Sequence, residues 1–300
     1  RTMLVAGTRS SGKTSLLGSL LLEIMPSHRI ITIEDTLELP VTAMRKLDYD
    51  ILSMKVRSAL AGESTEVAAE EGIRSSLRLG DSSLIVGEIR SAEAKALYEA
   101  MRVGALANVV AGTIHGGSPY SVFDRVVNDL GVPVTSFKAT DLIVVANPIK
   151  SADGLHSWRR VLQITEVRKH WTEDPLREGG FVDLMKYDVE EDLMKPTDDL
   201  INGDSEIIKD IAANVKGWAG DWDAVWDNVV LRQQIKQETV DFAERVKMPE
   251  LLEGGFTVKS NNAFHQISDK VTAEIGLPTS DRVFPEWKRW LEKESKRLNI

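Results

Sequence analysis

The chain of 300 residues contains no cysteine, which excludes disulfide bonds, thiolate metal sites and a cysteine nucleophile. It contains no apolar run long enough to span a bilayer, so we expect no transmembrane segment. It also lacks a basic excess, because its formal net charge is −9. This acidic balance disfavours proteins that coat nucleic acid, and we expect no stable nucleic-acid binding.

The composition that remains is typical of a globular protein. Hydrophobic residues make up 42% of the chain and charged residues 28%, which is enough apolar material for a core. The residue pattern changes at about residue 190, from alternating β-rich and amphipathic stretches to helical and acidic ones. We therefore expect an α/β core with edge strands over residues 1–190 and a helical C-terminal domain over residues 191–300.

The first region alternates short apolar runs with helical patterns, which predicts βαβ units and a mostly parallel sheet flanked by helices. Right-handed crossovers bring the strand C-termini to one edge, where ligands bind. A later antiparallel pair is expected at the sheet edge over 161–168 and 179–187. The parallel strands are predicted at Met3–Ala6, Arg29–Ile33, Ser83–Gly87, Asn108–Thr113 and Asp141–Ala146, and the helices at Lys13–Met25, Glu66–Leu79, Ala92–Val103 and Tyr120–Leu130.

The segment between the first predicted strand and helix fits the phosphate-binding pattern G-x-x-x-x-G-K-[ST] without a mismatch. Glycines allow backbone N–H groups to approach a triphosphate closely. Lys13 supplies a point charge for the β- and γ-phosphates, and the Thr14 hydroxyl is placed to hold Mg²⁺. The segment therefore predicts ATP and Mg²⁺ binding by Gly7, Thr8, Arg9, Ser10, Ser11, Gly12, Lys13, Thr14 and Ser15.

Two carboxylates follow other predicted strands. Glu34 begins the acidic segment Glu34–Glu38, where it would hold Mg²⁺ through water or orient an attacking water. Glu88 ends the apolar run Leu84–Gly87, the Walker B arrangement, and is the better candidate for activating the water or contacting the metal through water. The alternatives are a solvated acidic loop and an ordinary Glu88–Arg90 pair, although Arg90 could also orient Glu88.

His115 ends the fourth predicted parallel strand, in Gly112-Thr113-Ile114-His115, with a flexible Gly-Gly behind it. At this position an imidazole could sense the γ-phosphate by hydrogen bonding and pass its presence to a neighbouring group. The alternative is a structural histidine with satisfied hydrogen bonds. Together these segments predict Glu88, Glu34, His115 and Arg90 as catalytic residues.

In this order, the four segments resemble the type II/IV secretion ATPase superfamily. Its pattern is a Walker A loop, an acidic Asp box, a Walker B strand ending Gly-Glu-[Ile/Val]-Arg, and a His box ending in Thr-x-His. Here these are Gly7–Thr14, Glu34–Glu38, Leu84–Arg90 and Gly112–His115. The likeness covers about residues 1–150, and the long tail is more similar to archaeal members. Two segments depart from the pattern, namely Gly80–Ser83 and Arg90-Ser91.

The resemblance implies a RecA-like P-loop NTPase fold, ATP hydrolysis with Mg²⁺, and a homo-hexameric ring. It implies a cytoplasmic protein, peripheral to the cytoplasmic membrane, that drives a polytopic membrane platform protein. Its work would be assembly or secretion of pilin-like subunits in a type IV pilus, archaeal flagellum or type II/IV secretion system. The alternatives are a DNA-transfer ATPase or nucleic-acid translocase, and a nucleotide-binding regulatory subunit that does not hydrolyse ATP.

Two further expectations concern the ends of the chain. The first strand begins almost at Arg1, with no initiator Met, so we expect an upstream domain that in the family supplies arginines and base contacts. In the tail, Trp218, Trp222 and Trp226 recur every four residues, which predicts an aromatic stripe on a helix. We interpret that stripe as core packing in preference to a docking face for a membrane partner.

Overall fold

The computed structural model of the chain describes residues 1–57, 67–80, 82–103 and 109–298. It consists of two compact units, Arg1–Asn202 and Gly203–Ile300. Strand β9 (Leu193–Pro196) pairs with β8 (Phe181–Asp188) and extends the sheet of the first unit past residue 190, and the expected domain boundary at 190/191 stays a prediction. Glu66, Asp81 and Asn108, which belong to segments discussed above, lie outside the described residues.

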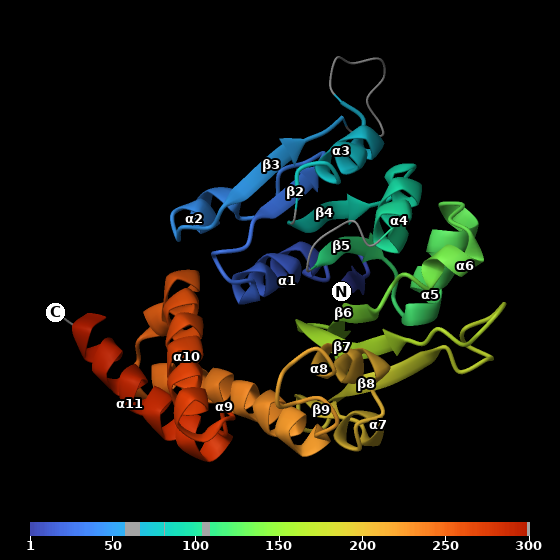
Figure 1. The fold of residues 1–300 in the computed structure, drawn as a ribbon. Helices are drawn as coiled ribbons and strands as arrows, with labels where there is room; N and C mark the ends of the chain where they lie inside the picture. The colour runs from blue at the N-terminus through green and yellow to red at the C-terminus, as the bar shows by residue number, and fades with distance from the viewer. Residues whose placement is uncertain (58–66, 81, 104–108, 299–300) are drawn as a thin grey trace. The chain divides into compact units, whose positions relative to one another are not determined.

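The first unit is built on a nine-stranded sheet with the order β3-β2-β4-β5-β1-β6-β7-β8-β9 (Figure 1). In this order, each pair of neighbours from β3 to β6 is parallel. The pairs β6–β7, β7–β8 and β8–β9 are antiparallel. The predicted mostly parallel sheet is therefore confirmed. The parallel strands are β1 (Thr2–Gly7), β2 (Ile30–Glu34), β3 (Ile51–Lys55), β4 (Ser83–Ile89), β5 (Val110–His115) and β6 (Leu142–Lys150).

Strand β3 was not predicted from the sequence. It pairs only with β2 among the described strands, and most of its residues are half-buried or exposed, including Leu52. A five-residue edge strand of this kind has no long apolar run, so its pattern is too short to distinguish from a loop.

Helices cover both faces of the parallel sheet, as expected for βαβ units. On one face, Leu4, Ile33 and Val86 join side chains of several helices in the main core, among them Tyr98. On the other face, α1 packs against β1 and β5. The helices of this unit are α1 (Lys13–Leu20), α2 (Val41–Arg45), α3 (Ala69–Ser76), α4 (Glu93–Val103), α5 (Pro119–Asp124), α6 (Val134–Phe137) and α7 (Asp198–Ile201), with short turns η1 (Leu21–Glu23) and η2 (Arg125–Asp129).

The antiparallel extension begins at a hairpin between β6 and β7 (Ser157–Val167). The expected antiparallel pair is β7 and β8, although β7 begins before residue 161 because it follows β6 to its end at Lys150. After β7, Trp171 is fully buried and packs edge-on against Phe123, with ring centroids 5.7 Å apart. Its Nε1 donates to the Arg168 carbonyl at 2.7 Å, which satisfies the buried indole.

The second unit is helical, as expected, and its core forms between α9 (Trp222–Val246), α10 (Gly254–Ile275) and α11 (Ser280–Leu298). The second unit also contains helix α8 (Glu206–Ala212) and the turn η3 (Pro249–Leu252). Trp287 is fully buried in this core. The predicted tryptophan stripe is only partly present, because α9 begins at Trp222 and Trp218 lies in the preceding turn. The rings of Trp222 and Trp226 stack at 6.3 Å.

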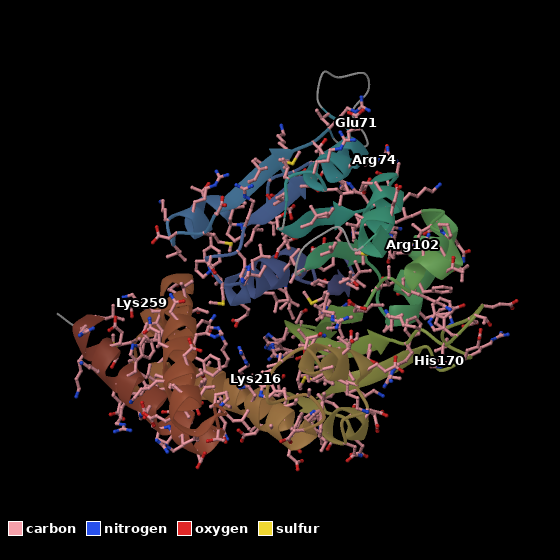
Figure 2. All side chains as sticks on the ribbon, in the orientation of Figure 1. Glu71, Arg74, Arg102, His170, Lys216 and Lys259 are labelled. Atoms are coloured by element: carbon pink, nitrogen blue, oxygen red, sulfur yellow. The ribbon has the colours of Figure 1, made fainter. Side chains whose placement is uncertain are left out.

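Charged side chains spread over the outer helices of each unit (Figure 2). Examples are Glu71 and Arg74 on α3, and Lys259 on α10, which pairs with Glu294 at 3.2 Å. Within the described ranges, none of the helices combines the length and the apolar character needed to cross a membrane.

Trp171 offers a test of the first unit's core. Replacing a fully buried aromatic side chain by alanine loses its transfer energy and leaves a cavity, so Trp171→Ala should destabilise this unit by about 3–5 kcal/mol. Trp158→Ala is the matched control, since Trp158 is 44% exposed. Urea denaturation of both variants measures the difference, and equal losses of stability would contradict the described packing.

Candidate functional site

The glycine-rich loop between β1 and α1 is shaped by close contacts that only glycine permits. A Cβ on Gly7 would lie 2.0 Å from the Ala146 carbonyl oxygen and 2.3 Å from Ser11 Oγ. Gly12 has a φ of 88°, in the left-handed region, and immediately precedes Lys13, the first residue of α1. The loop therefore presents its backbone at the N-terminus of α1, where N–H groups favour anions.

The Lys13 ammonium is buried and folded onto its own loop. Its Nζ donates to the Thr8 carbonyl oxygen at 3.0 Å. Burial lowers the pKa of Lys13, while the carboxylates of Glu88 and Glu38 oppose this effect. The charge is thus held in a partly dry position at the strand edge, bound by a backbone carbonyl that a phosphate oxygen could replace.

The acidic segment after β2 folds around the Glu34 side chain. This carboxylate is 2% exposed, and its Oε1 accepts the N–H groups of Glu38 and Leu39, each at 2.9 Å. A Cβ on Gly87 would lie 2.9 Å from Glu34 Cγ, so the glycine before Glu88 makes room for Glu34. Glu34 therefore shapes the loop that continues to Glu38.

Glu38, and not Glu34, contacts the first turn of α1. The Thr14 hydroxyl donates to Glu38 Oε2 at 2.9 Å. In the sequence, Glu38 belongs to the acidic segment Glu34–Glu38 but is not among the predicted site residues. Its contact depends on the way the loop turns back over Glu34, which residue spacing alone does not reveal. The metal-binding role of Glu34 stays a prediction.

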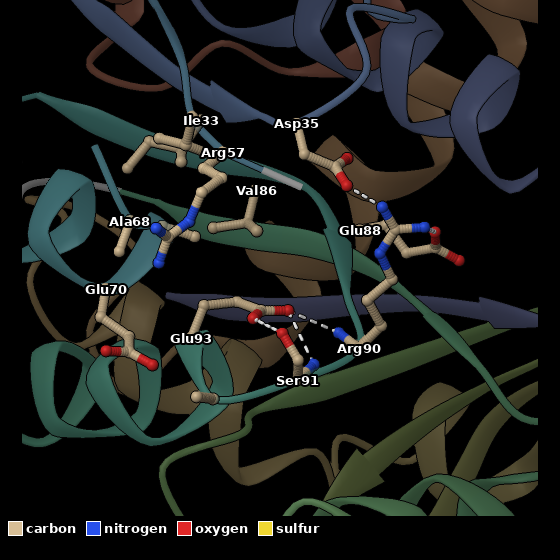
Figure 3. A pocket seen from close by; sticks show the side chains of 13 residues that line it. Ile33, Asp35, Arg57, Ala68, Glu70, Val86, Glu88, Arg90, Ser91 and Glu93 are labelled. Carbon is tan, nitrogen blue, oxygen red and sulfur yellow. Dashed lines mark hydrogen bonds and ion pairs between the residues drawn. The ribbon is translucent and has the colours of Figure 1, made fainter. Parts of the chain in front are cut away.

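Glu88, at the end of β4, lies between a cation and an imidazole. Arg90 Nη1 lies 3.1 Å from Glu88 Oε2, and His115 Nε2 lies 3.3 Å from Glu88 Oε1. Arg90 also pairs with Asp35, a contact that the sequence analysis did not predict (Figure 3). The backbone N–H of Arg90 donates to Glu93 Oε1 at 2.7 Å, which fixes the chain after the strand. The Glu88 carboxylate is consequently oriented from two sides.

The four predicted catalytic residues and four of the predicted loop residues line one cavity of about 390 Å³ at the carboxyl edge of the parallel sheet. A second cavity, of about 290 Å³, shares Asp35, Glu88 and Arg90 as its wall (Figure 3). Of the remaining predicted residues, Ser15 lines a neighbouring hollow, and the others form the loop backbone. The larger cavity is lined by Arg9, Ser10, Lys13, Thr14, Glu34, Asp35, Thr36, Glu38, Gly87, Glu88, Arg90, Thr113 and His115.

A parallel sheet with a glycine-rich loop between its first strand and first helix, and with a lysine and a threonine beginning that helix, defines a P-loop fold. A model of the type II/IV secretion system protein family matches residues 1–173. Because this match covers more than half of the chain, the chain belongs to that family. The family predicted from the sequence motifs is therefore confirmed.

Known proteins similar to this chain include archaeal and bacterial ones. The uncharacterized protein MJ1287 of Methanocaldococcus jannaschii is 30% identical over 212 residues, which are 70% of this chain and 72% of that protein. The VirB11 protein of Agrobacterium fabrum is 29% identical over 179 residues, 60% of this chain and 50% of VirB11. The chain thus spans about half the length of VirB11.

Two further similarities are shorter or more distant. A putative conjugal transfer protein of Mycobacterium tuberculosis, Rv3659c, is 32% identical over 119 residues, 40% of this chain and 32% of that protein. Among solved structures, the VirB11 ATPase of the Brucella suis type IV secretion system is 24% identical. Its alignment has a TM-score of 0.43 and covers 55% of this chain and 48% of that one.

The protonation of His115 can be measured directly. Burial lowers the pKa of this imidazole, the Lys13 charge lowers it further, and Glu88 raises it. Glu88→Gln removes the raising charge, so the pKa of His115 should fall further below its usual 6.5. Lys13→Met removes a lowering charge and should raise the pKa. NMR titration of the histidine ring protons checks both signs, with the other histidines as internal controls. Shifts in the opposite directions would contradict the described electrostatics.

Proposed function

We propose that this chain is the ATP-hydrolysing core of a secretion or filament-assembly ATPase. One observation supports this most: Lys13, Thr14, Glu88 and His115 come from three different strand ends and line one cavity. A cavity of this size and polarity at the carboxyl edge of a parallel sheet suits a nucleotide's phosphates. Membership of the secretion family supports the same activity.

Binding of ATP would use the loop and the start of α1. The loop N–H groups and the Lys13 ammonium bind the phosphates, with Lys13 leaving the Thr8 carbonyl for the β- and γ-phosphates. Thr14 would hold Mg²⁺, which would neutralise charge that develops on the phosphates. The fit is supported by the left-handed backbone of Gly12 directly before α1 and by the Thr14 hydroxyl, which contacts Glu38 at the surface of the site.

Hydrolysis would depend on Glu88. Its carboxylate accepts a proton from the attacking water, and Arg90 and His115 keep it in place. The lowered pKa of His115 makes the neutral imidazole the main form at pH 7, so its Nε2, 3.3 Å from Glu88 Oε1, faces the carboxylate without forming an ion pair. A neutral ring in this position is also able to hydrogen-bond the γ-phosphate and report its presence to Glu88.

The wider role follows from the family. We propose that the complete protein works as a homo-hexameric ring on the cytoplasmic side of a membrane, bound to a polytopic platform protein. Hydrolysis would drive assembly or secretion of pilin-like subunits in a type IV pilus, an archaeal flagellum or a type II/IV secretion system. The acidic net charge of −9 favours a protein partner over nucleic acid.

A second candidate is a DNA-transfer ATPase, which the likeness to a putative conjugal transfer protein favours. Turnover stimulated by DNA, with an affinity that falls steeply as salt increases, would support this alternative. A regulatory subunit that binds but never hydrolyses ATP is less favoured, because the chain has the lysine, threonine and glutamate that hydrolysis would need, at Lys13, Thr14 and Glu88.

The proposal predicts a separation of binding from turnover. In the full-length protein, Glu88→Gln should leave ATP affinity unchanged and lower kcat by about 10²–10⁴-fold, the usual contribution of a general base. Glu99→Gln is the control, because Glu99 is 64% exposed and lies outside both cavities. Steady-state hydrolysis and ATP-binding titrations test this, together with the oligomer mass with and without ATP. Full turnover in Glu88→Gln, or none in the wild type, would refute the proposal.

A further inference from the structure

Asn147 lies where strand β6 passes the phosphate loop. The pairing of β6 with β7 shifts there: Val145 pairs with Gln163, but Ala146 pairs with Val161, so β7 contributes one extra residue. Such bulges re-aim the side chains that follow them. Asn147 comes directly after the shift, is half-buried, and belongs to none of the motifs identified in the sequence.

The Asn147 amide group bridges two segments that are far apart in the sequence. Its Oδ1 accepts the Thr8 N–H at 2.9 Å, and its Nδ2 donates to the Gly117 carbonyl at 3.2 Å. Thr8 begins the phosphate loop, and Gly117 follows His115 by two residues. The carbonyl half of the amide faces a donor and the NH₂ half faces an acceptor, so this orientation satisfies both neighbours and the reverse orientation satisfies neither.

Both backbone polar groups of Thr8 are therefore held by side chains. Asn147 holds the N–H, and the Lys13 ammonium holds the carbonyl. When Lys13 turns to the phosphates of a nucleotide, the Thr8 carbonyl keeps the Ser11 N–H, which donates to it at 3.3 Å. The bond from the Thr8 N–H to Asn147 does not involve Lys13.

Asn147 then adds a side-chain link between the loop and the segment of His115, beside the backbone bond from the Gly116 N–H to the Gly7 carbonyl at 3.3 Å. The His115 Nε2 in turn lies 3.3 Å from Glu88 Oε1.

We propose that Asn147 is a positioning residue that couples occupancy of the phosphate loop to the placement of His115 beside Glu88. This inference rests on the proposed hydrolysis of ATP. It assigns a part of that site's regulation to strand β6, outside the four motifs. Asn147 itself touches no reacting group. Asn147 acts through its hydrogen bond to Thr8 on one side and through its hydrogen bond to Gly117, two residues after His115, on the other.

Two substitutions separate the two hydrogen bonds. Asn147→Asp keeps an acceptor for the Thr8 N–H but replaces the donor to Gly117 by a carboxylate oxygen, whereas Asn147→Ala removes both. At saturating ATP in the full-length protein, Asn147→Asp should lower kcat about tenfold, the size expected for one lost hydrogen bond. Its ATP affinity should also fall, because the aspartate adds a negative charge beside the phosphate loop. Lys150→Ala, an exposed change further along β6, is the control and should behave like the wild type.

A double-mutant cycle with His115→Ala distinguishes positioning from general damage to the fold. If Asn147 acts through His115, the loss of kcat caused by Asn147→Asp should almost disappear in the His115→Ala background. A loss of the same size in both backgrounds would overturn the inference, as would an unchanged kcat in Asn147→Asp.

Hydrogen exchange gives a readout that does not require turnover. ADP binding should slow exchange of the amides of residues 113–118 in the wild type and in Lys150→Ala, but much less in Asn147→Asp. If the wild type binds ADP but does not hydrolyse ATP, the proposed function is wrong. The difference in ADP-dependent exchange between the wild type and Asn147→Asp still tests whether Asn147 couples the loop to the His115 segment. Equal protection in all three proteins would overturn the coupling alone, and failure of the wild type to bind ADP would overturn both.

Discussion

The close packing of strand β6 on the start of the phosphate loop is the constraint on which the rest of the site depends. The Ala146 carbonyl occupies the space that a Cβ on Gly7 would need. Because β1 is hydrogen-bonded between β5 and β6, this contact fixes where the loop leaves the sheet. The beginning of α1, and with it Lys13 and Thr14, is placed as a consequence. A larger residue at position 7 would displace the whole phosphate-binding segment.

The carboxylates of the site are held by hydrogen bonds and ion pairs from the protein itself. Glu34 accepts two backbone N–H groups, Glu38 accepts the Thr14 hydroxyl, and Asp35 and Glu88 share Arg90. Lys13 is left with a backbone carbonyl, and burial lowers its pKa. A phosphate group would relieve this desolvation, because it offers the ammonium a full negative charge. Of these groups, Lys13 is therefore the one that a bound phosphate would stabilise most.

The sequence was sufficient to predict the parallel sheet, the family and the strand-end motifs. Each motif is a contiguous segment next to a strand. The apolar pattern of that strand shows where the strand ends, and so places the motif at the carboxyl edge of the sheet. Glu38 and Asn147 were missed for a different reason. Glu38 reaches Thr14 because the loop folds around Glu34, and Asn147 reaches Thr8 beside the register shift that one extra residue of β7 produces against β6. Both depend on backbone paths that neither hydrophobic periodicity nor a short motif records.

The order of the strands explains why His115 occupies an intermediate position. Strand β5 lies between β4 and β1, so any contact between the phosphate loop and Glu88 along the sheet edge passes over the end of β5. In the parallel pairing, His115 stands beside Gly7, and its neighbour Ile114 stands beside Ile89. An imidazole at this point can face the loop and the Glu88 carboxylate together. Asn147 approaches the same loop from β6, on the opposite side of β1, so the loop is connected to both neighbouring strands.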